Sequence, residues 1–356
     1  MAIFNGQLNS NEIFAALYNM IISQYVFADN IYRSNSELID EARVDGSLYG
    51  DTKLYYATDA LESVPWGNDA EAQNLLRIHR PKEPKCEKIT LDVFRMIPLT
   101  VDYYLSKRAW GTEDAFNQFT SVMLQWLRNT KICYETKNYN AFIGTHVDTV
   151  SKMGVVEVEL PKGETVEATN RLEAQTIAQS VADTFTRMKD VTRDFNQFGF
   201  MRSYNMDNLK VVWNSKYVNK IRNIDLPTIF HNDKLLEKWE DYVLPEYYFG
   251  DVNAEETAGD NATVYSLTEQ TIGENHYFAG ELIKEGDTAP AGTSYTINDK
   301  IICKVIHDDS VPYMSAFETE TSFFNPRSLT ENHYLIWGHN TLVALGALPF
   351  VTLQVK

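Results

Sequence analysis

The feature of this sequence that most constrains its fold is one long β-strand pattern in the segment KITLDVFRMIPLTVDYYLSK, residues 88–107. Apolar side chains fill the odd-numbered positions from Ile89 to Val101, and Arg95 is the single exception on that face. A period of two residues is typical of a strand with one buried face. At about 3.3 Å per residue the strand would reach roughly 43 Å, about twice the usual length. We therefore expect it to extend beyond a compact body.

The residues before this strand indicate an antiparallel partner. KLYYAT, beginning at Lys53, has the composition of a short strand, and the tract from 59 to 85 contains the breakers Pro65, Gly67, Pro81 and Pro84. These elements predict a hairpin that we call the extended arm, residues 46–105. Such an arm has an apolar face and two open edges, which soluble monomers avoid. We therefore expect a second copy of the chain to cover it.

A basic cluster lies at the end of the arm. RIHRPKEPK, residues 77–85, is the only dense basic stretch in a chain with 49 acidic and 32 basic residues. Contact with an acidic region of a neighbouring copy is therefore favoured over contact with phosphate. The predicted interface between copies comprises Ile89, Leu91, Val93, Ile97, Leu99, Val101, Arg77, Arg80, Lys82 and Lys85.

Composition limits the classes of function. A chain of 356 residues exceeds the size of a single hydrophobic core, so we expect two domains or one domain with appendages. Its formal charge of −17 predicts repulsion of nucleic acid and anionic membranes, although a container for nucleic acid tolerates this sign. Three widely spaced cysteines, Cys86, Cys133 and Cys303, indicate neither a disulfide framework nor a zinc site, and a reducing cytosol fits them best.

The remaining periodicities predict a mixed α+β fold. Residues 11–27 are typical of an amphipathic helix that packs on protein, and no segment predicts a transmembrane span. A long helix begins after Thr112, ends at about residues 131–138 and is closed off by Gly144; its apolar stripe is Phe116, Phe119, Met123, Trp126, Thr130 and Cys133. The later elements are a hairpin at 155–170, a helix at 171–192, a strand at 209–214, a short helix, a β-rich insertion at about 242–300, and closing strands.

Two histidine pairs are the best candidates for metal or acid–base chemistry. His146 with Asp148 and His307 with Asp308 and Asp309 have ligand-type side chains at strand ends. The interpretation we favour is that they are turn residues, because no spacing links the two groups. His333 and His339 are interpreted in the same way, as polar positions of an edge strand. No catalytic or cofactor-binding motif occurs, so we predict neither a cofactor nor a bound metal.

Taken in order, these segments resemble a known family. The strand KITLDVFRMIPLTVDYYL, the helix TEDAFNQFTSVMLQWLRNTKICYETKNYNAFIG, the strand and helix of LKVVWNSKYVNKIRN, and the tail FFNPRSLTENHYLIWGHNTLVALGALPFVTLQV are similar to the major capsid proteins of tailed bacteriophages. The resemblance implies the tailed-phage capsid fold, divided as follows: 1–45 N-terminal arm, 46–105 extended loop, 106–145 peripheral domain with a spine helix, 146–305 axial domain, and 306–356 return to the peripheral domain.

The resemblance also implies a structural role and no enzymatic activity. The chain would form hexamers and pentamers of an icosahedral shell that encloses double-stranded DNA without sequence-specific binding, in the host cytoplasm before assembly and in the virion capsid afterwards. The expected partners are copies of the chain itself, a portal protein and a separate scaffolding protein, because fold-like elements begin almost at Met1. No membrane partner is expected. Covalent links through Lys82, Lys85 or Lys88 are conceivable, but nothing in the sequence indicates them.

Two alternatives remain at this point. An encapsulin-type compartment has a similar fold, but the β-rich insertion and the N-terminal segment favour the phage protein. A metal-dependent hydrolase would use His146, Asp148, His307 and Asp308.

The interface prediction is testable by substitution. Replacing Leu91 or Leu99 with Asp would place an unpaired charge in a contact between copies. The expected outcome is loss of assembly with the body still folded, measured by sedimentation and circular dichroism.

Overall fold

The computed structural model describes residues 36–46, 50–63, 78, 80–102, 113–223, 240–254, 256–257 and 263–356. The helix predicted at 11–27 and the predicted interface residue Arg77 lie outside these ranges. Within them, helices alternate with two five-stranded sheets and several smaller ones, which confirms the mixed α+β class. Among the described helices, none is long and apolar enough to cross a membrane.

The first large sheet contains the long strand. Its order is β1 (Arg43–Asp45), β15 (Tyr313–Asn325), β16 (Thr330–Asn340), β3 (Lys85–Asp102) and β2 (Thr52–Ala57). β3 has 18 residues, so the predicted strand is confirmed and extends further than expected.

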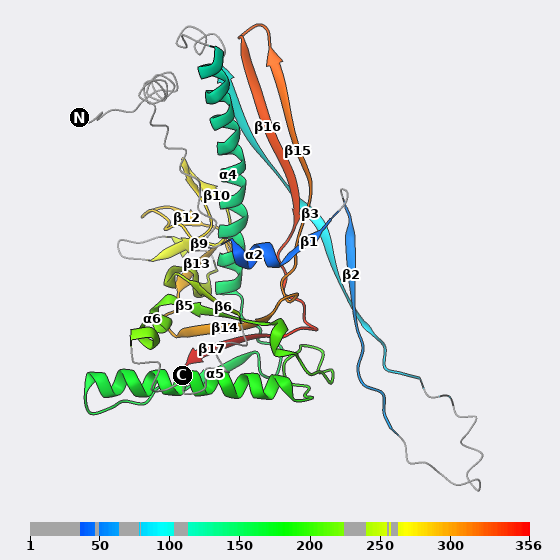
Figure 1. Cartoon of the computed structure of the whole chain (residues 1–356), viewed down its shortest axis with the longest axis vertical. Helices are drawn as coiled ribbons and strands as arrows, with labels where there is room; N and C mark the ends of the chain where they lie inside the picture. The colour runs from blue at the N-terminus through cyan, green and yellow to red at the C-terminus, as the bar shows by residue number, and fades with distance from the viewer. Residues whose placement is uncertain are drawn as a thin grey trace.

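β3 pairs with different strands along its length. Residues 85–90 pair antiparallel with β2, whereas residues 91–102 pair antiparallel with β16 of the same chain. Only the first third of β3 therefore belongs to a two-stranded arm, which Figure 1 shows leaving the body beside β1. The prediction that the whole strand projects was wrong, because β16 supplies a partner from its own chain. β15, which packs on β16, was not predicted as a strand at all.

α4 (Glu113–Thr145) runs along this sheet and confirms the predicted long helix. The contact between them is a cluster of Leu127, Tyr134, Leu335 and Trp337, with Ile97 and Leu99 packed against it. The predicted stripe is only partly correct, because Met123 is buried but Trp126 is 41% exposed. The side chains of Phe116 and Phe119 lie outside the described part of the helix.

The second large sheet forms the other half of the body. Its order is β4 (Val155–Val158), β17 (Phe350–Val355), β14 (Ile301–His307), β5 (Leu209–Asn214) and β6 (Glu240–Leu244). α5 (Val166–Lys189) covers it, and the predicted face of Ile177, Val181, Phe185 and Met188 is buried in a core cluster with residues of β5, β14 and β17. α6 (Ser215–Asn223) follows β5, as expected.

α5 begins five residues earlier than the sequence pattern indicated. The predicted second strand of a hairpin, residues 165–170, is instead the cap and first turn of this helix. Thr165 Oγ1 accepts a hydrogen bond at 3.2 Å from the backbone N–H of Ala168, which satisfies an N–H group that the first helical turn leaves unpaired. The alternating sequence TVEATN fits either structure, and the cap determines which one forms.

The segment between β6 and β14, both strands of the second sheet, is β-rich, as predicted. Its strands are β7 (Gly250–Val252), β8 (Glu256–Thr257), β9 (Val264–Ser266), β10 (Gln270–Ile272), β11 (Asn275–Tyr277), β12 (Thr288–Ala289) and β13 (Ser294–Ile297). Lys137 of α4 donates to Glu281 at 2.9 Å and lies over the ring of Phe278, so this insertion is fastened to the long helix. Residues 306–356 do not stay in one region, because β15 and β16 join the first sheet and β17 joins the second.

The carboxyl end of α4 meets the centre of the second sheet. α4 ends one residue beyond Gly144, and a Cβ at that position would lie 2.1 Å from the backbone oxygen of Tyr248, so only glycine allows this approach. The last turn of α4 contains no basic residue. Lys304 of β14 supplies a hydrogen-bond donor instead, since its Nζ donates to the carbonyl of His146 at 2.9 Å and to Thr352 Oγ1 at 3.0 Å.

We predict that Lys304 makes the stability of the fold depend on pH. Complete burial lowers the pKa of Lys304 from 10.5 to about 7. Between these values the unfolded chain binds more protons than the folded chain, so stability should rise with pH, by up to about 5 kcal/mol in total. Lys304→Met should remove this rise, and Lys300→Met, at an exposed position, should keep it. Unfolding free energies measured from pH 7 to pH 10 test this, and parallel curves for the wild type and Lys304→Met would contradict it.

Candidate functional site

The predicted apolar interface lies largely within its own chain. Ile89 and Leu91 are buried in a cluster with Met314 and Leu345, and Leu91 is only 1% exposed. Val101 is also buried, and the remaining apolar members of the face, Val93, Ile97 and Leu99, are partly buried. The argument that a second copy must cover this face was therefore wrong for the buried residues, because β15, β16 and α4 already cover it.

Arg95, the exception on the apolar face, contacts the insertion. Its guanidinium forms an ion pair with Glu269, which lies between β9 and β10, and is 4.9 Å from the ring centre of Tyr134. Glu269 also lies 3.0 Å from Nε2 of His276. A cavity of about 280 Å³ adjoins these groups. The charge that interrupts the strand pattern thus joins the first sheet to the insertion.

Carboxylates fasten the arm to the segment that precedes β17. Glu87 accepts hydrogen bonds from the backbone N–H groups of Gly346 at 2.7 Å and Ala347 at 3.2 Å. Asp92 accepts from the backbone N–H of Thr341 at 2.7 Å and from its hydroxyl at 2.8 Å. Charge-assisted bonds of this kind are stronger than neutral ones. The base of the arm is therefore held to its own body by polar contacts as well as apolar packing.

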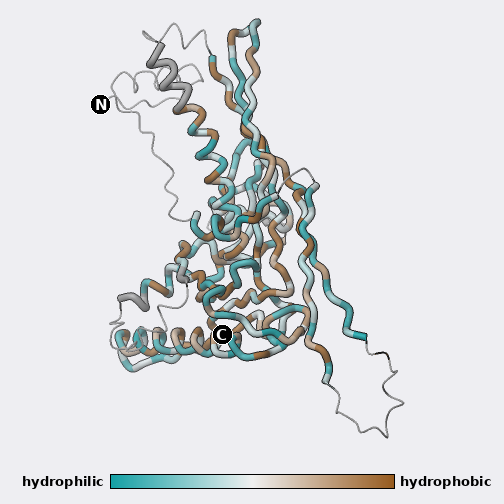
Figure 2. Tube along the Cα trace, turned by 45° about the vertical axis from the view of Figure 1, so that its right-hand side comes forward, coloured by the Kyte–Doolittle hydropathy of each residue, from teal (hydrophilic) through white to brown (hydrophobic). Residues whose placement is uncertain are grey.

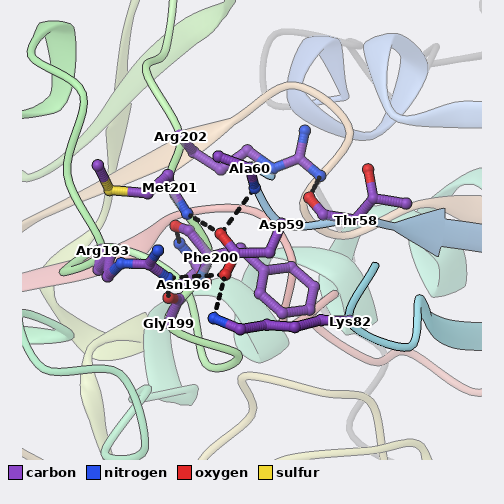
Figure 3. A network of polar contacts seen from close by, with 10 residues as sticks. All are labelled: Thr58, Asp59, Ala60, Lys82, Arg193, Asn196, Gly199, Phe200, Met201 and Arg202. Carbon is purple, nitrogen blue, oxygen red and sulfur yellow. Dashed lines mark hydrogen bonds and ion pairs between the residues drawn. The ribbon is translucent and has the colours of Figure 1, made fainter. Parts of the chain in front are cut away.

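A third carboxylate, Asp59, lies just beyond β2. Figure 3 shows Lys82 and Arg193 converging on it from different segments. Lys82 Nζ is 3.1 Å from Asp59 Oδ2, and Arg193 Nη1 is 2.9 Å from the same oxygen. The partner of Lys82 is therefore an acid of its own arm, whereas the sequence analysis favoured an acid of a neighbouring copy.

The arm exposes side chains that its own body does not cover. Leu54 and Tyr56 project from β2 and are more than half exposed. Beyond Asp59, Leu61 and Ile78 are each 77% exposed. The basic residues Arg80, Lys85 and Lys88 are exposed as well. In Figure 2 hydrophilic and hydrophobic residues alternate along the arm after it leaves the body. These exposed residues, which we call the open face of the arm, were only partly included in the predicted interface.

The histidine pairs have structural roles. Asp148 Oδ1 accepts hydrogen bonds from the backbone N–H groups of Val150 and Ser151, and His307 Nδ1 accepts one from Asp309 N–H at 3.2 Å. The interpretation as turn formers at a strand end is confirmed for His307, which ends β14. Asp148 also stabilises a turn, but it and His146 follow the end of α4 and not a strand. Burial lowers the pKa of His146, whose ring stacks on Phe142. Within the described ranges, no three His, Cys, Asp or Glu side chains are placed to hold a metal ion.

His333 and His339 do not lie on an edge strand. β16 runs between β15 and β3, so both residues are on an inner strand and both are buried. His339 Nε2 and the hydroxyl of Tyr134 are 2.9 Å apart and share a hydrogen bond. The imidazole ring of His339 also stacks on the ring of Tyr313. Burial lowers the pKa of His339, which keeps the ring neutral. His339 is thus part of the contact between β16 and α4.

Comparison with known proteins identifies the family. A family model described as Phi29-like phage major capsid protein matches residues 2–342. The chain belongs to this family. It is a major capsid protein of tailed phages, as the order of its segments had indicated, and the family is structural and not enzymatic. The hydrolase alternative is thereby overturned. No match was found among curated proteins.

Solved phage structures share the fold. A chain in the capsid structure of Staphylococcus phage Andhra matches with a TM-score of 0.63 and 9% identity, covering 93% of this chain and 87% of that one. A chain in the structure of the head fiber and inner core protein gp22 of native bacteriophage P68 matches with a TM-score of 0.59 and 10% identity, covering 89% of this chain and 84% of that one. At these identities the likeness concerns the fold, which is that of phage capsid structures.

The burial of Leu91 changes the expected effect of substitution. Leu91→Asp should now unfold the chain itself, because it loses a buried leucine and places a carboxylate in an apolar cluster, a cost above about 3 kcal/mol. Leu54→Asp, on the open face of the arm, should change stability by less than about 0.5 kcal/mol. Urea denaturation of the two purified variants distinguishes these outcomes. Equal stabilities would show that the cluster around Leu91 does not form in the free chain.

Proposed function

We propose that this capsid protein forms hexamers and pentamers of an icosahedral shell that encloses double-stranded DNA. The observation that carries the proposal is the exposure of Leu61 and Ile78 beyond the last described contact between the arm and its body. Large aliphatic side chains at the end of a projecting hairpin need a covering surface. Membership of a capsid family makes another copy of the chain the natural partner.

The contact between copies uses the open face of the arm. Residues of the arm of one copy meet a different surface on the next copy, which is a heterologous contact that propagates until rotation closes a ring or shell. Leu54, Tyr56, Leu61 and Ile78 supply apolar area. Arg80 and Lys85 supply positive charge, which is complementary to the acidic remainder of a chain with formal charge −17.

The charge of the chain also suits a container. A shell of strongly acidic subunits does not bind its DNA tightly, so enclosure without sequence-specific recognition agrees with this composition. We further propose assembly in the host cytoplasm with a separate scaffolding protein and a portal protein. We also propose the division into an N-terminal arm, extended loop, peripheral domain and axial domain, with β17 assigned to the axial domain because it pairs within the second large sheet.

Charge reversal at the end of the arm tests the interface. The variant with Arg80→Glu and Lys85→Glu should raise the protein concentration needed for assembly at least tenfold, because like charges would meet across the contact. The control, Lys162→Glu with Lys300→Glu, changes the net charge equally at exposed positions of the body. Light scattering and negative-stain microscopy measure the result. Equal loss of assembly in both variants would show a net-charge effect and contradict an interface at the arm.

Expression of the chain alone tests the role of scaffolding. We expect irregular or open particles, because a separate protein would set the curvature of the shell. Uniform closed shells seen by electron microscopy would contradict the requirement for scaffolding, while supporting the proposal of shell formation.

A further inference from the structure

Asp59 lies where three parts of the chain meet. Its carboxylate accepts hydrogen bonds from the backbone N–H of Ala60 at 2.9 Å and of Met201 at 3.0 Å, besides the contacts with Lys82 and Arg193. Ala60 lies on the side of the arm that leaves the body and Lys82 on the side that returns to it. Arg193 and Met201 belong to the body. The Asp59 side chain is only 2% exposed, although it lies on a projecting arm. Figure 3 shows all four donors around it.

The part of the body that receives Asp59 is itself well ordered by hydrogen bonds. Thr192 and Arg202 exchange two backbone hydrogen bonds, at 2.9 and 3.0 Å, which close the loop between them. Within the loop, the side chain of Asn196 bonds both the N–H and the carbonyl of Phe200 at 2.8 Å. Arg202 also donates to the carbonyl of Thr58 at 3.1 Å. Asp59 therefore meets a preformed loop, which we call the receiving loop, residues 192–202.

A cavity of about 310 Å³ lies near this contact, and its lining includes Tyr55 of β2 and Tyr204, Leu345 and Leu348 of the body. Tyr55 and Leu348 also pack against the apolar cluster that contains Leu345. Asp59 lies farther along the chain than this cluster, so its polar contacts direct the arm where the apolar packing ends.

We propose that Asp59 is a positioning residue that fixes the direction of the extended arm against its own body before a neighbouring copy binds. The inference rests on the proposed shell-forming function and extends it. An arm already held in its binding direction loses less conformational freedom on assembly, and preorganisation of this kind strengthens association. The four donors also hold the pKa of the Asp59 carboxyl well below its usual value of 3.8. The contact therefore stays charged above that pH and weakens only as the pH falls below it.

The substitution Asp59→Asn tests the proposal with little change in shape. An amide keeps one acceptor oxygen but does not pair with two cations. Hydrogen exchange of the Ala60 and Met201 amides in the unassembled subunit should become at least tenfold faster. The concentration needed for assembly should rise several-fold, while the melting temperature of the body stays within about 2 °C. Glu62→Gln, which neutralises an exposed carboxylate of the same arm, is the matched control and should change none of these quantities.

A double-mutant cycle separates positioning from a general loss of stability. Arg193→Gln removes the charged partner on the body. The variant with both Asp59→Asn and Arg193→Gln should assemble no worse than Asp59→Asn alone, because each substitution removes the ion pair between Asp59 and Arg193. Arg193→Lys, which keeps the charge, should restore part of the assembly. Additive effects of the two substitutions, or absence of amide protection in the wild-type subunit, would overturn the proposal.

The test of the positioning role of Asp59 is distinct from the test of the proposed shell-forming function. Normal assembly of Asp59→Asn after loss of amide protection would overturn the positioning role and leave the proposed function intact. Failure of the wild-type chain to assemble under any condition would contradict the proposed function. The contact of Asp59 with the receiving loop would still be tested in that case, because protection of the Ala60 and Met201 amides is measured on the free subunit.

Discussion

The fold depends on the way in which one strand changes partners. β3 pairs with β2 over its first residues and with β16 over the rest, so a single continuous backbone belongs both to the arm and to the sheet that packs on α4. Inside the body, Leu91 and its neighbours bury the apolar face. Farther out, the same alternation meets solvent on the arm. β3 is unusually long for a strand of a soluble protein because it pairs both with β2 in the arm and with β16 in the body.

Polar contacts direct the arm where apolar packing ends. Glu87 and Asp92 accept hydrogen bonds from backbone groups of the segment before β17, and Asp59 accepts them from the receiving loop. Backbone N–H groups are fixed in direction by the loops that carry them, so these contacts specify an angle better than aliphatic side chains do. An acidic chain has many carboxylates available for this purpose, and Glu87 and Asp59 of the arm face donors of its own body. Exposed apolar residues remain beyond the last of these contacts, where a neighbour is needed.

The sequence was informative where the signal is periodic. β3, α4 and α5 were predicted because their side chains alternate at two or recur at three to four residues, whereas β5 was predicted from a short apolar run and the β-rich insertion from its Gly, Thr and Asn content. β15 was missed because its segment FETETSFFN, residues 317–325, has charged residues on one face and aromatic residues on both faces. Neither face therefore has the apolar pattern of a buried strand face. Trp126 was misplaced because a helical stripe gives the spacing of buried residues but not which edge of the stripe reaches the sheet. Asp59 gave no signal at all, because its partners on the body lie more than 130 residues away in the chain.

The continuity of β3 has a mechanical consequence. A strand of 18 residues spans roughly 60 Å and resists stretching, because its backbone is already extended. Force applied to the arm is carried along β3 past Arg95, whose ion pair with Glu269 transmits it to the insertion. In the proposed shell, tension on the arm of one subunit would therefore reach the insertion of that subunit as well, and strain would be shared between the two.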